Sequence, residues 1–333
     1  MKKKQILGIF AAALAFVFVC GTSILLKNFV GDGGKKQTNL MQDTLGNLDD
    51  SSVNLPLNPF IGVVKVDGTI IQSTSSLLDS ESYNHQKTLK LIDQYQNSAQ
   101  NKGILLYLNT PGGGVYESDE LYNRLEAYKQ KTGRPVWAYM ANEACSGGYY
   151  VSMAADRIIA NRNTWTGSIG VIVELSNYKG LMDKLGVSTI LFTSGPNKSM
   201  GNPGVSVTNE QKQIFQGLVD EAYGQFVGIV AKGRKMDASV VKPIADGRVY
   251  TAKQALDLKL IDEIGEYDAA QAEMKKKVGG NAEIFTPKAS EFSLKSLFSM
   301  ANSLKPRSDA EELKDFMDSQ ESGVPMYYAE IGK

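Results

Sequence analysis

Ser146 is the residue of this sequence whose surroundings most clearly suggest covalent chemistry. It lies in the stretch Ala-Cys-Ser-Gly-Gly, where two glycines follow the hydroxyl at the expected beginning of a helix. The free N–H groups of a first helical turn favour negative charge and could stabilise an oxyanion as it forms. Serine is also a common N-terminal cap of helices, so a simple capping residue is the alternative.

A second glycine-rich turn follows a buried strand, in the stretch Asn109-Thr-Pro-Gly-Gly-Gly114. Its backbone is free to offer N–H groups to a ligand, and we interpret Gly113 as a second oxyanion donor. An ordinary turn between a strand and a helix is the alternative. A phosphate loop fits poorly, because no Gly-Lys-Ser/Thr follows and the glycine spacing differs from that of a dinucleotide fingerprint.

A nucleophilic serine needs a base, and the chain contains a single histidine, His85. His85 is distant in sequence from both glycine-rich turns, so we expect a surface or capping role and exclude a Ser-His-Asp triad. Cys145 as a nucleophile would also lack a base, so we expect it to pack as a small buried hydrophobic residue. Cys20 and Cys145 are not expected to form a disulfide, and no His/Cys cluster has the spacing of metal ligands.

A lysine can replace histidine when burial lowers its pKa, which is about 10.4 in water. Lys198 is the best candidate, because no Asp or Glu occurs from residue 184 to 209 and because it follows the expected buried strand Val187–Thr193. An exposed loop lysine is the alternative. Ser168, in Thr-Gly-Ser-Ile-Gly, could hold the lysine amine or only shape a turn. The less suitable lysines lie on or near helices expected to face solvent: Lys129, Lys131, Lys179 and Lys184.

Strands and helices alternate over residues 58–287, at a spacing that predicts βαβ units and an α/β fold with a largely parallel sheet. We interpret this range as the catalytic domain. Its expected elements include strands over Phe60–Ile70, Gly103–Thr110 and Pro135–Met140 and helices over Val115–Lys131 and Thr208–Lys235. The last helix begins with a capping box that Thr208 forms with Gln211.

The first 27 residues predict a cytoplasmic stub and a transmembrane helix. Ile6–Leu26 carries no charge and has about the length that a bilayer core requires. Lysines precede it, so we expect a single-pass protein of the cell membrane with a cytoplasmic N-terminus and an extracytoplasmic catalytic domain. A cleaved signal peptide is the alternative. Residues 28–57 are expected to form a flexible stalk.

The charge balance and the C-terminal tail bear on the partners of the chain. The 36 basic and 36 acidic residues cancel, which gives no reason to expect nucleic acid as a partner. Residues 288–333 are a weakly patterned tail that ends in the apolar stretch Val324–Gly332. This stretch could lie in the chain's own substrate groove and be trimmed there, or it could be a disordered or packed C-terminus.

Four motifs in this order resemble the signal peptide peptidase A family of membrane-bound bacterial serine peptidases: NTPGGGVYES, ACSGGYYVSMAADRIIA, TGSIGV and TSGPNKS. The resemblance runs from about Phe60 to Pro287 and is greatest to the half-length form of Gram-positive bacilli. It implies a ClpP/crotonase-like fold and an endopeptidase that degrades signal peptides left in the membrane after secretion. By motif, the resemblance implies the nucleophile Ser146, the general base Lys198, the lysine-orienting hydroxyl Ser168 and the oxyanion donors Gly113 and Gly147.

The resemblance also bears on assembly, because in double-length members the lysine and the serine come from different halves of the chain. This sequence has one copy, which implies a homo-oligomeric ring whose sites are completed by a neighbour's Lys198. No metal or cofactor is implied. Two other functions remain open, namely an acyl-coenzyme A hydratase or thioesterase on the same scaffold and a non-catalytic membrane scaffold.

Overall fold

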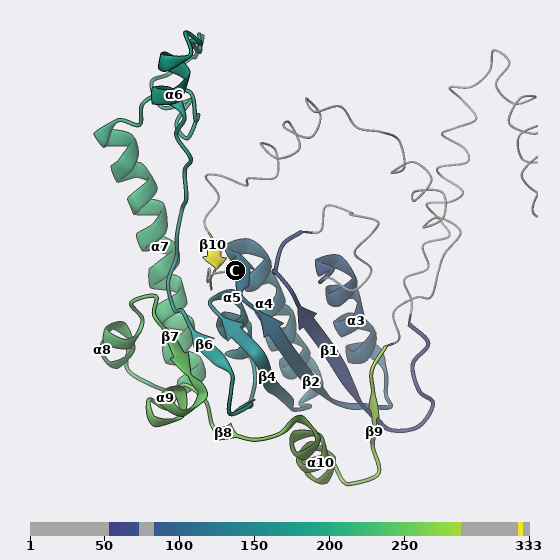
Figure 1. Cartoon of the computed structure of the whole chain (residues 1–333). Helices are drawn as coiled ribbons and strands as arrows, with labels where there is room; N and C mark the ends of the chain where they lie inside the picture. The colour runs from purple at the N-terminus through teal and green to yellow at the C-terminus, as the bar shows by residue number, and fades with distance from the viewer. Residues whose placement is uncertain (1–52, 73–82, 288–325, 329–333) are drawn as a thin grey trace, which may run out of the picture. The chain divides into compact units, whose positions relative to one another are not determined.

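The structure is a computed structural model that describes residues 53–72, 83–287 and 326–328. The alternation of strands and helices confirms the expected α/β class. Along the chain (Figure 1) the described elements are β1 (Phe60–Asp67), α3 (His85–Asn97), β2 (Asn101–Thr110), β3 (Gly112–Gly114), α4 (Val115–Thr132), β4 (Val136–Cys145), α5 (Gly147–Ser152), β5 (Arg157–Ala160), β6 (Trp165–Gly167), α6 (Lys179–Lys184), α7 (Asn209–Arg234), α8 (Ala238–Val241), a 3₁₀ turn (Lys242–Ile244), β7 (Val249–Thr251), α9 (Ala252–Asp257), β8 (Glu263–Ile264), α10 (Tyr267–Lys277), β9 (Glu283–Phe285) and β10 (Met326–Tyr328).

A largely parallel sheet forms the centre of this part of the chain. Its strand order is β7-β6-β4-β2-β1-β9, and β5 pairs with β4 and with β8. β4 has two neighbours on the same side, because residues 137–140 pair with β5 whereas residues 143–145 pair with β6. The pair β6–β7 is antiparallel, and the other pairs of this sheet are parallel. The predicted largely parallel sheet is therefore confirmed.

Alternate residues of the central strands face two different layers, as the two-residue period of a strand requires. In β2, Leu106 and Leu108 face a large apolar cluster that includes side chains of α3, α4, α5 and α7. Leu105 faces a smaller cluster that includes Met274 of α10. The sheet is thus covered on both faces, which explains why its strands read as nearly continuous apolar runs.

The prediction of a strand over Val187–Thr193 is wrong, because these residues form no strand and are largely exposed. Phe192 is 96% exposed and Ile190 is 75% exposed. They belong to an arm, residues 171–208, that runs from the end of β6 along α7 to α6 and returns (Figure 1). Among the residues that the structure describes, no neighbouring strand pairs with this segment. The predicted capping box of α7, in contrast, is confirmed at Thr208 and Gln211.

The expected membrane anchor Ile6–Leu26 lies outside the described residues, as do most of the stalk and of the C-terminal tail. Among the helices that are described, none combines the length and the apolar character needed to cross a bilayer.

Candidate active site

Ser146 occupies a strained turn between the end of β4 and the start of α5. Its φ of 50° and ψ of −112° are unusual for a residue with a side chain, and such strain concentrates at functional sites. Its N–H donates to the carbonyl of Gly167 at 2.8 Å, and its own carbonyl accepts from the N–H of Tyr150. The side chain makes no capping hydrogen bond to α5. Ser146 therefore occupies the N-cap position of α5, but its side chain does not cap the helix.

The hydroxyl of Ser146 is buried without a partner. The side chain is 1% exposed, and Oγ makes no hydrogen bond to any described residue. A buried hydroxyl without a partner costs free energy, and it persists where a bound group or a reaction uses it. This environment suits a nucleophile better than a structural serine.

The two glycine-rich turns meet beside Ser146, as the sequence predicted. A Cβ placed on Gly147 would lie 3.1 Å from the N of Gly113, so the backbones of the two expected oxyanion donors are in close contact. Gly147 is the first residue of α5, and its N–H therefore has no acceptor within the helix. Two backbone hydrogen bonds to Ile70 fix the Gly112–Gly114 turn. The N–H of Ile70 donates to the carbonyl of Gly112, and the carbonyl of Ile70 accepts from the N–H of Gly114.

Ser168 lies next to Ser146, on the neighbouring strand end. β4 and β6 pair through Cys145 and Gly167, so the two serines follow paired residues. Ser168 is 7% exposed and, like Ser146, has a positive φ, of 47°. The N–H of Ser168 donates to the carbonyl of Arg248 at 2.8 Å, which anchors this conformation. The structure thus brings together Ser146, Ser168 and the two glycine turns.

Lys198 is not brought to this group within one chain. It is an exposed residue of the arm, between α6 and α7, and it makes no hydrogen bond to the Ser146 hydroxyl. Figure 1 shows α6 and the first turns of α7 far from α5. A catalytic role of Lys198 in its own chain is therefore unsupported, and the expectation that a neighbouring chain supplies this lysine stays a prediction.

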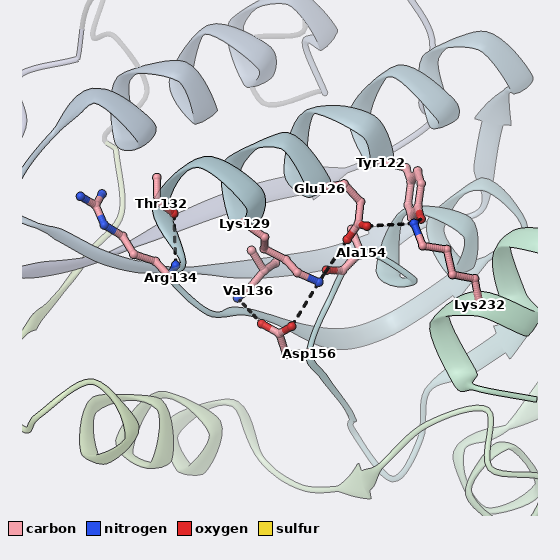
Figure 2. A network of polar contacts seen from close by, with 9 residues as sticks. All are labelled: Tyr122, Glu126, Lys129, Thr132, Arg134, Val136, Ala154, Asp156 and Lys232. Carbon is pink, nitrogen blue, oxygen red and sulfur yellow. Dashed lines mark hydrogen bonds and ion pairs between the residues drawn. The ribbon is translucent and has the colours of Figure 1, made fainter.

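Lys129 is a half-buried lysine of the same domain, and its ion pairs exclude it as a neutral base. Its ammonium group contacts Asp156 and Glu126, each at 3.1 Å, and donates to the carbonyl of Ala154 at 2.7 Å (Figure 2). Burial alone lowers the pKa of Lys129, but Asp156 and Glu126 outweigh it and hold the pKa above its usual value. Lys129 therefore stays charged and joins α4 to the segment before β5.

His85 is buried, so the expected surface position is wrong, although the exclusion of a triad stands. Nδ1 lies 2.6 Å from the hydroxyl of Tyr83, and Nε2 lies 2.9 Å from a carboxylate oxygen of Glu120. The contact with Glu120 joins α3 to α4, and the contact with Tyr83 joins α3 to the segment before it. Asn84 rather than His85 caps α3.

Cys145 is buried as predicted, and it is unsuited to act as a nucleophile. Burial, followed by the charge of Glu143, raises the pKa of its thiol to about 12. The thiolate that attacks carbonyl groups is therefore not populated near neutral pH.

The C-terminal strand β10 lies between two segments of the chain at this site. Its residues pair antiparallel with β3, placing Tyr327 opposite Gly113. On its other edge, Met326 exchanges two backbone hydrogen bonds with Ile172, at 3.0 and 3.1 Å. A peptide is thus bound between two chain segments as an added strand, a common mode of peptide recognition. For residues 326–328, the described part of the stretch Val324–Gly332, this pairing is consistent with the interpretation that the tail lies in the substrate groove.

The sequence did not single out three residues that the structure places here. Gly112 has a φ of 110°, and a Cβ on it would lie 2.1 Å from the carbonyl oxygen of Tyr327 and 2.8 Å from the N of Gly147. Ser118 is fully buried, and its unpartnered Oγ lies 2.5 Å from a Cβ placed on Gly147. The third residue is Tyr327 itself. The run of three glycines was the available signal for Gly112.

Comparison with known proteins shows which family this chain resembles. The model of peptidase family S49 matches residues 128–281, which include Ser146, Ser168 and Lys198. A protein of Enterococcus faecium, provisionally named signal peptide peptidase SppA, is 42% identical over 221 residues, or 66% of this chain and 64% of that protein. A protein of Synechocystis sp., provisionally named a protease, is 38% identical over 212 residues, or 63% of this chain and 72% of that protein.

A third relative is longer than this chain. Protease 4 of Haemophilus influenzae is 32% identical over 249 residues, which are 74% of this chain but 39% of that protein. The fold, the strained serine and the relatives together define a serine peptidase with a ClpP-like α/β fold. Within that class, the chain belongs to peptidase family S49, the family of the SppA peptidases.

Proposed function

We propose that this chain is a membrane-anchored serine endopeptidase that degrades remnant signal peptides after protein secretion. Ser146 is the nucleophile, Lys198 of a neighbouring copy is the general base, and Ser168 orients the lysine amine. The observation that carries the proposal is the Ser146 hydroxyl, which is buried, unpartnered and strained beside a groove that binds an extended peptide.

The proposed reaction uses only side chains and backbone N–H groups. Neutral Lys198 accepts the proton of Ser146 as Oγ attacks the peptide carbonyl. The N–H groups of Gly113 and Gly147 stabilise the oxyanion, and one good donor of this kind contributes roughly 3–4 kcal/mol. Lys198 then protonates the leaving amine, the acyl-enzyme forms, and water repeats the cycle to release the product.

The exposed apolar arm supports the homo-oligomeric assembly that this mechanism needs. The arm carries the candidate base together with large apolar side chains that a single chain leaves uncovered. Several large exposed apolar side chains on one segment are typical of protein–protein contacts. The uncovered side chains are Tyr178, Leu181, Leu185, Val187, Ile190 and Phe192. A neighbouring copy that covers the arm would also remove Lys198 from water.

The membrane role rests on the apolar run Ile6–Leu26 and on the name of the Enterococcus relative. An anchor with a cytoplasmic N-terminus would hold the extracytoplasmic peptidase at the membrane surface, where remnant signal peptides remain. The acyl-coenzyme A alternative is less well supported, because the groove beside Ser146 accepts an extended strand through backbone pairing on both edges.

A synthetic signal peptide in detergent micelles tests the proposed substrate. The purified full chain is expected to cut the peptide into fragments detectable by mass spectrometry, and Ser146→Ala protein is expected to leave it intact. A water-soluble peptide of the same length is the control. Cleavage of the soluble peptide together with an intact signal peptide would retain the peptidase and reject the signal-peptide role.

We also propose that the peptidase trims its own C-terminus. The carbonyl oxygen of Tyr327 lies against Gly112 at the expected oxyanion turn, so the bond after Tyr327 is the one presented to Ser146. Intact mass measurement is expected to show that wild-type protein loses residues 328–333, whereas Ser146→Ala protein keeps them. Equal masses for the two proteins would reject self-cleavage.

A further inference from the structure

The side chain of Tyr327 fills a pocket with aromatic walls. Its ring stacks on Tyr150 at a centroid distance of 5.0 Å and packs against Phe226 at 4.7 Å. The residue is fully buried, and its hydroxyl donates to the carbonyl of Ala222 at 3.2 Å. The pocket thus combines apolar walls from α5 and α7 with a hydrogen-bond acceptor at its far end.

Asp119 of α4 lies at the edge of this pocket and is held by neutral donors. One carboxylate oxygen accepts from the hydroxyl of Tyr150 at 2.6 Å and from the side-chain amide of Gln225 at 3.0 Å. The other accepts from the side-chain amide of Asn123 at 2.8 Å. Over residues 53–72, 83–287 and 326–328, no cation forms an ion pair with Asp119.

We propose that Asp119 is a specificity-determining residue, whose charge makes this pocket favour substrate side chains with a hydrogen-bond donor or a positive charge at the tip. The proposal rests on the peptidase function proposed above and adds the preferred side-chain class. Tyrosine and lysine fit the aromatic walls and present a donor to the acceptor end, whereas glutamate presents a like charge.

The field of Asp119 reaches the end of the pocket. The pKa of the Tyr327 hydroxyl is raised, first by burial and then by the negative charge of Asp119. The charge of Asp119 thus disfavours ionisation of the Tyr327 hydroxyl. The ring of Tyr150, which stacks on Tyr327 and donates to Asp119, lies between the two groups. The same charge would stabilise an ammonium group and destabilise a carboxylate at that position.

Peptides based on the chain's own tail test this inference. The series is Val-Pro-Met-X-Tyr-Ala-Glu-Ile, in which X is lysine or norleucine in one matched pair and glutamate or glutamine in the other. The full chain and its Asp119→Asn variant are assayed for kcat/KM at the bond after X. Asp119→Asn is expected to lower the ratio of kcat/KM for the lysine peptide to that for the norleucine peptide about fivefold. It is expected to raise the corresponding glutamate-to-glutamine ratio about fivefold. Effects of this size are expected when one partly screened charge pair is removed.

Two further variants separate the charge of Asp119 from its structural role. Asp119→Glu keeps the charge and is expected to keep both ratios near the wild-type values. Asp257→Asn removes an exposed charge on α9, where Asp257 pairs only with Lys253 among the described residues, and is expected to change neither ratio. The protein's own tail competes with all four peptides for the same binding site, and to the same degree. The ratios of kcat/KM measured with one preparation are therefore unaffected.

Equal losses for all four peptides in Asp119→Asn, or unchanged ratios, would overturn the assignment of specificity to Asp119. Binding of the same peptides to Ser146→Ala protein, with and without Asp119→Asn, measures the ratios without turnover. If cleavage is absent but the binding ratios shift as expected, the proposed peptidase function fails and the Asp119 inference stands. If the binding ratios do not shift, or if none of the peptides binds, the inference is wrong.

Discussion

Lys198→Ala and Ser146→Ala proteins, each inactive alone, are expected to regain peptidase activity when they are mixed and assemble together. Each single change is expected to lower kcat by about 10⁴-fold or more, because it removes the base or the nucleophile. In a mixed ring, some sites combine an intact Ser146 with an intact Lys198 from the next copy. Random pairing at such a head-to-tail contact restores about a quarter of the sites.

The expectation of shared sites follows from where the structure places the two residues. Ser146 Oγ is buried at the end of β4, whereas Lys198 is exposed on the arm of the same chain. Lys198→Arg protein is also expected to be inactive, because a guanidinium group does not release its proton near neutral pH. Lys253→Ala, which changes an exposed lysine of α9, is a matched control and should remain active.

Two results would contradict this account. Substantial activity of Lys198→Ala protein alone would reject Lys198 as the base. Inactive mixtures, after mass measurement has shown that mixed assemblies form, would reject the sharing of sites between copies. The co-assembly measurement is therefore the necessary companion of the activity assay.

Gly112→Ala is expected to lower kcat/KM by at least about 10²-fold while the protein remains folded. The added methyl group would lie 2.1 Å from the carbonyl oxygen of the bound strand and 2.8 Å from the N of Gly147. It would push the substrate carbonyl away from the expected oxyanion donors, and the loss of one such donor costs about 10²–10³ in rate.

Gly133→Ala is the matched control for backbone strain. Gly133 ends α4 with a φ of 67°, and a Cβ there would meet nothing within 4 Å. Both substitutions impose a positive φ on alanine, 110° at position 112 and 67° at position 133, and such backbone strain costs about 1–3 kcal/mol. Thermal unfolding should therefore shift in both variants, whereas only Gly112→Ala should lose activity. Equal activity of the two variants would refute the steric role of Gly112.

The parts of the fold that follow from local pattern were predictable. The apolar run of β2 and the capping box at Thr208 depend on residues close together in the sequence. β4 was predicted too short, at Pro135–Met140, because its last three residues are extended through pairing with β6. That pairing joins residues about twenty positions apart, and no local pattern of the strand itself shows it.

Errors at His85 and at Val187–Thr193 have the same physical cause. His85 is buried because Tyr83 and Glu120 satisfy both of its ring nitrogens, and Glu120 lies on the next helix. The run Val187–Thr193 has the composition of a strand, but a strand forms only where a partner completes its hydrogen bonds. Within the described chain no such partner lies beside it.

By itself the sequence determined the chemistry that this protein could perform: a serine before two glycines, a second glycine turn, a lysine without nearby acids and one unsuitable histidine. Only the tertiary structure decided that Ser146 is strained rather than capping, that the two turns meet, and that Tyr327 lies between β3 and Ile172. The reason is that residue types and local spacing set propensities along the chain. Contacts between distant segments depend instead on which surfaces can be buried and hydrogen-bonded together.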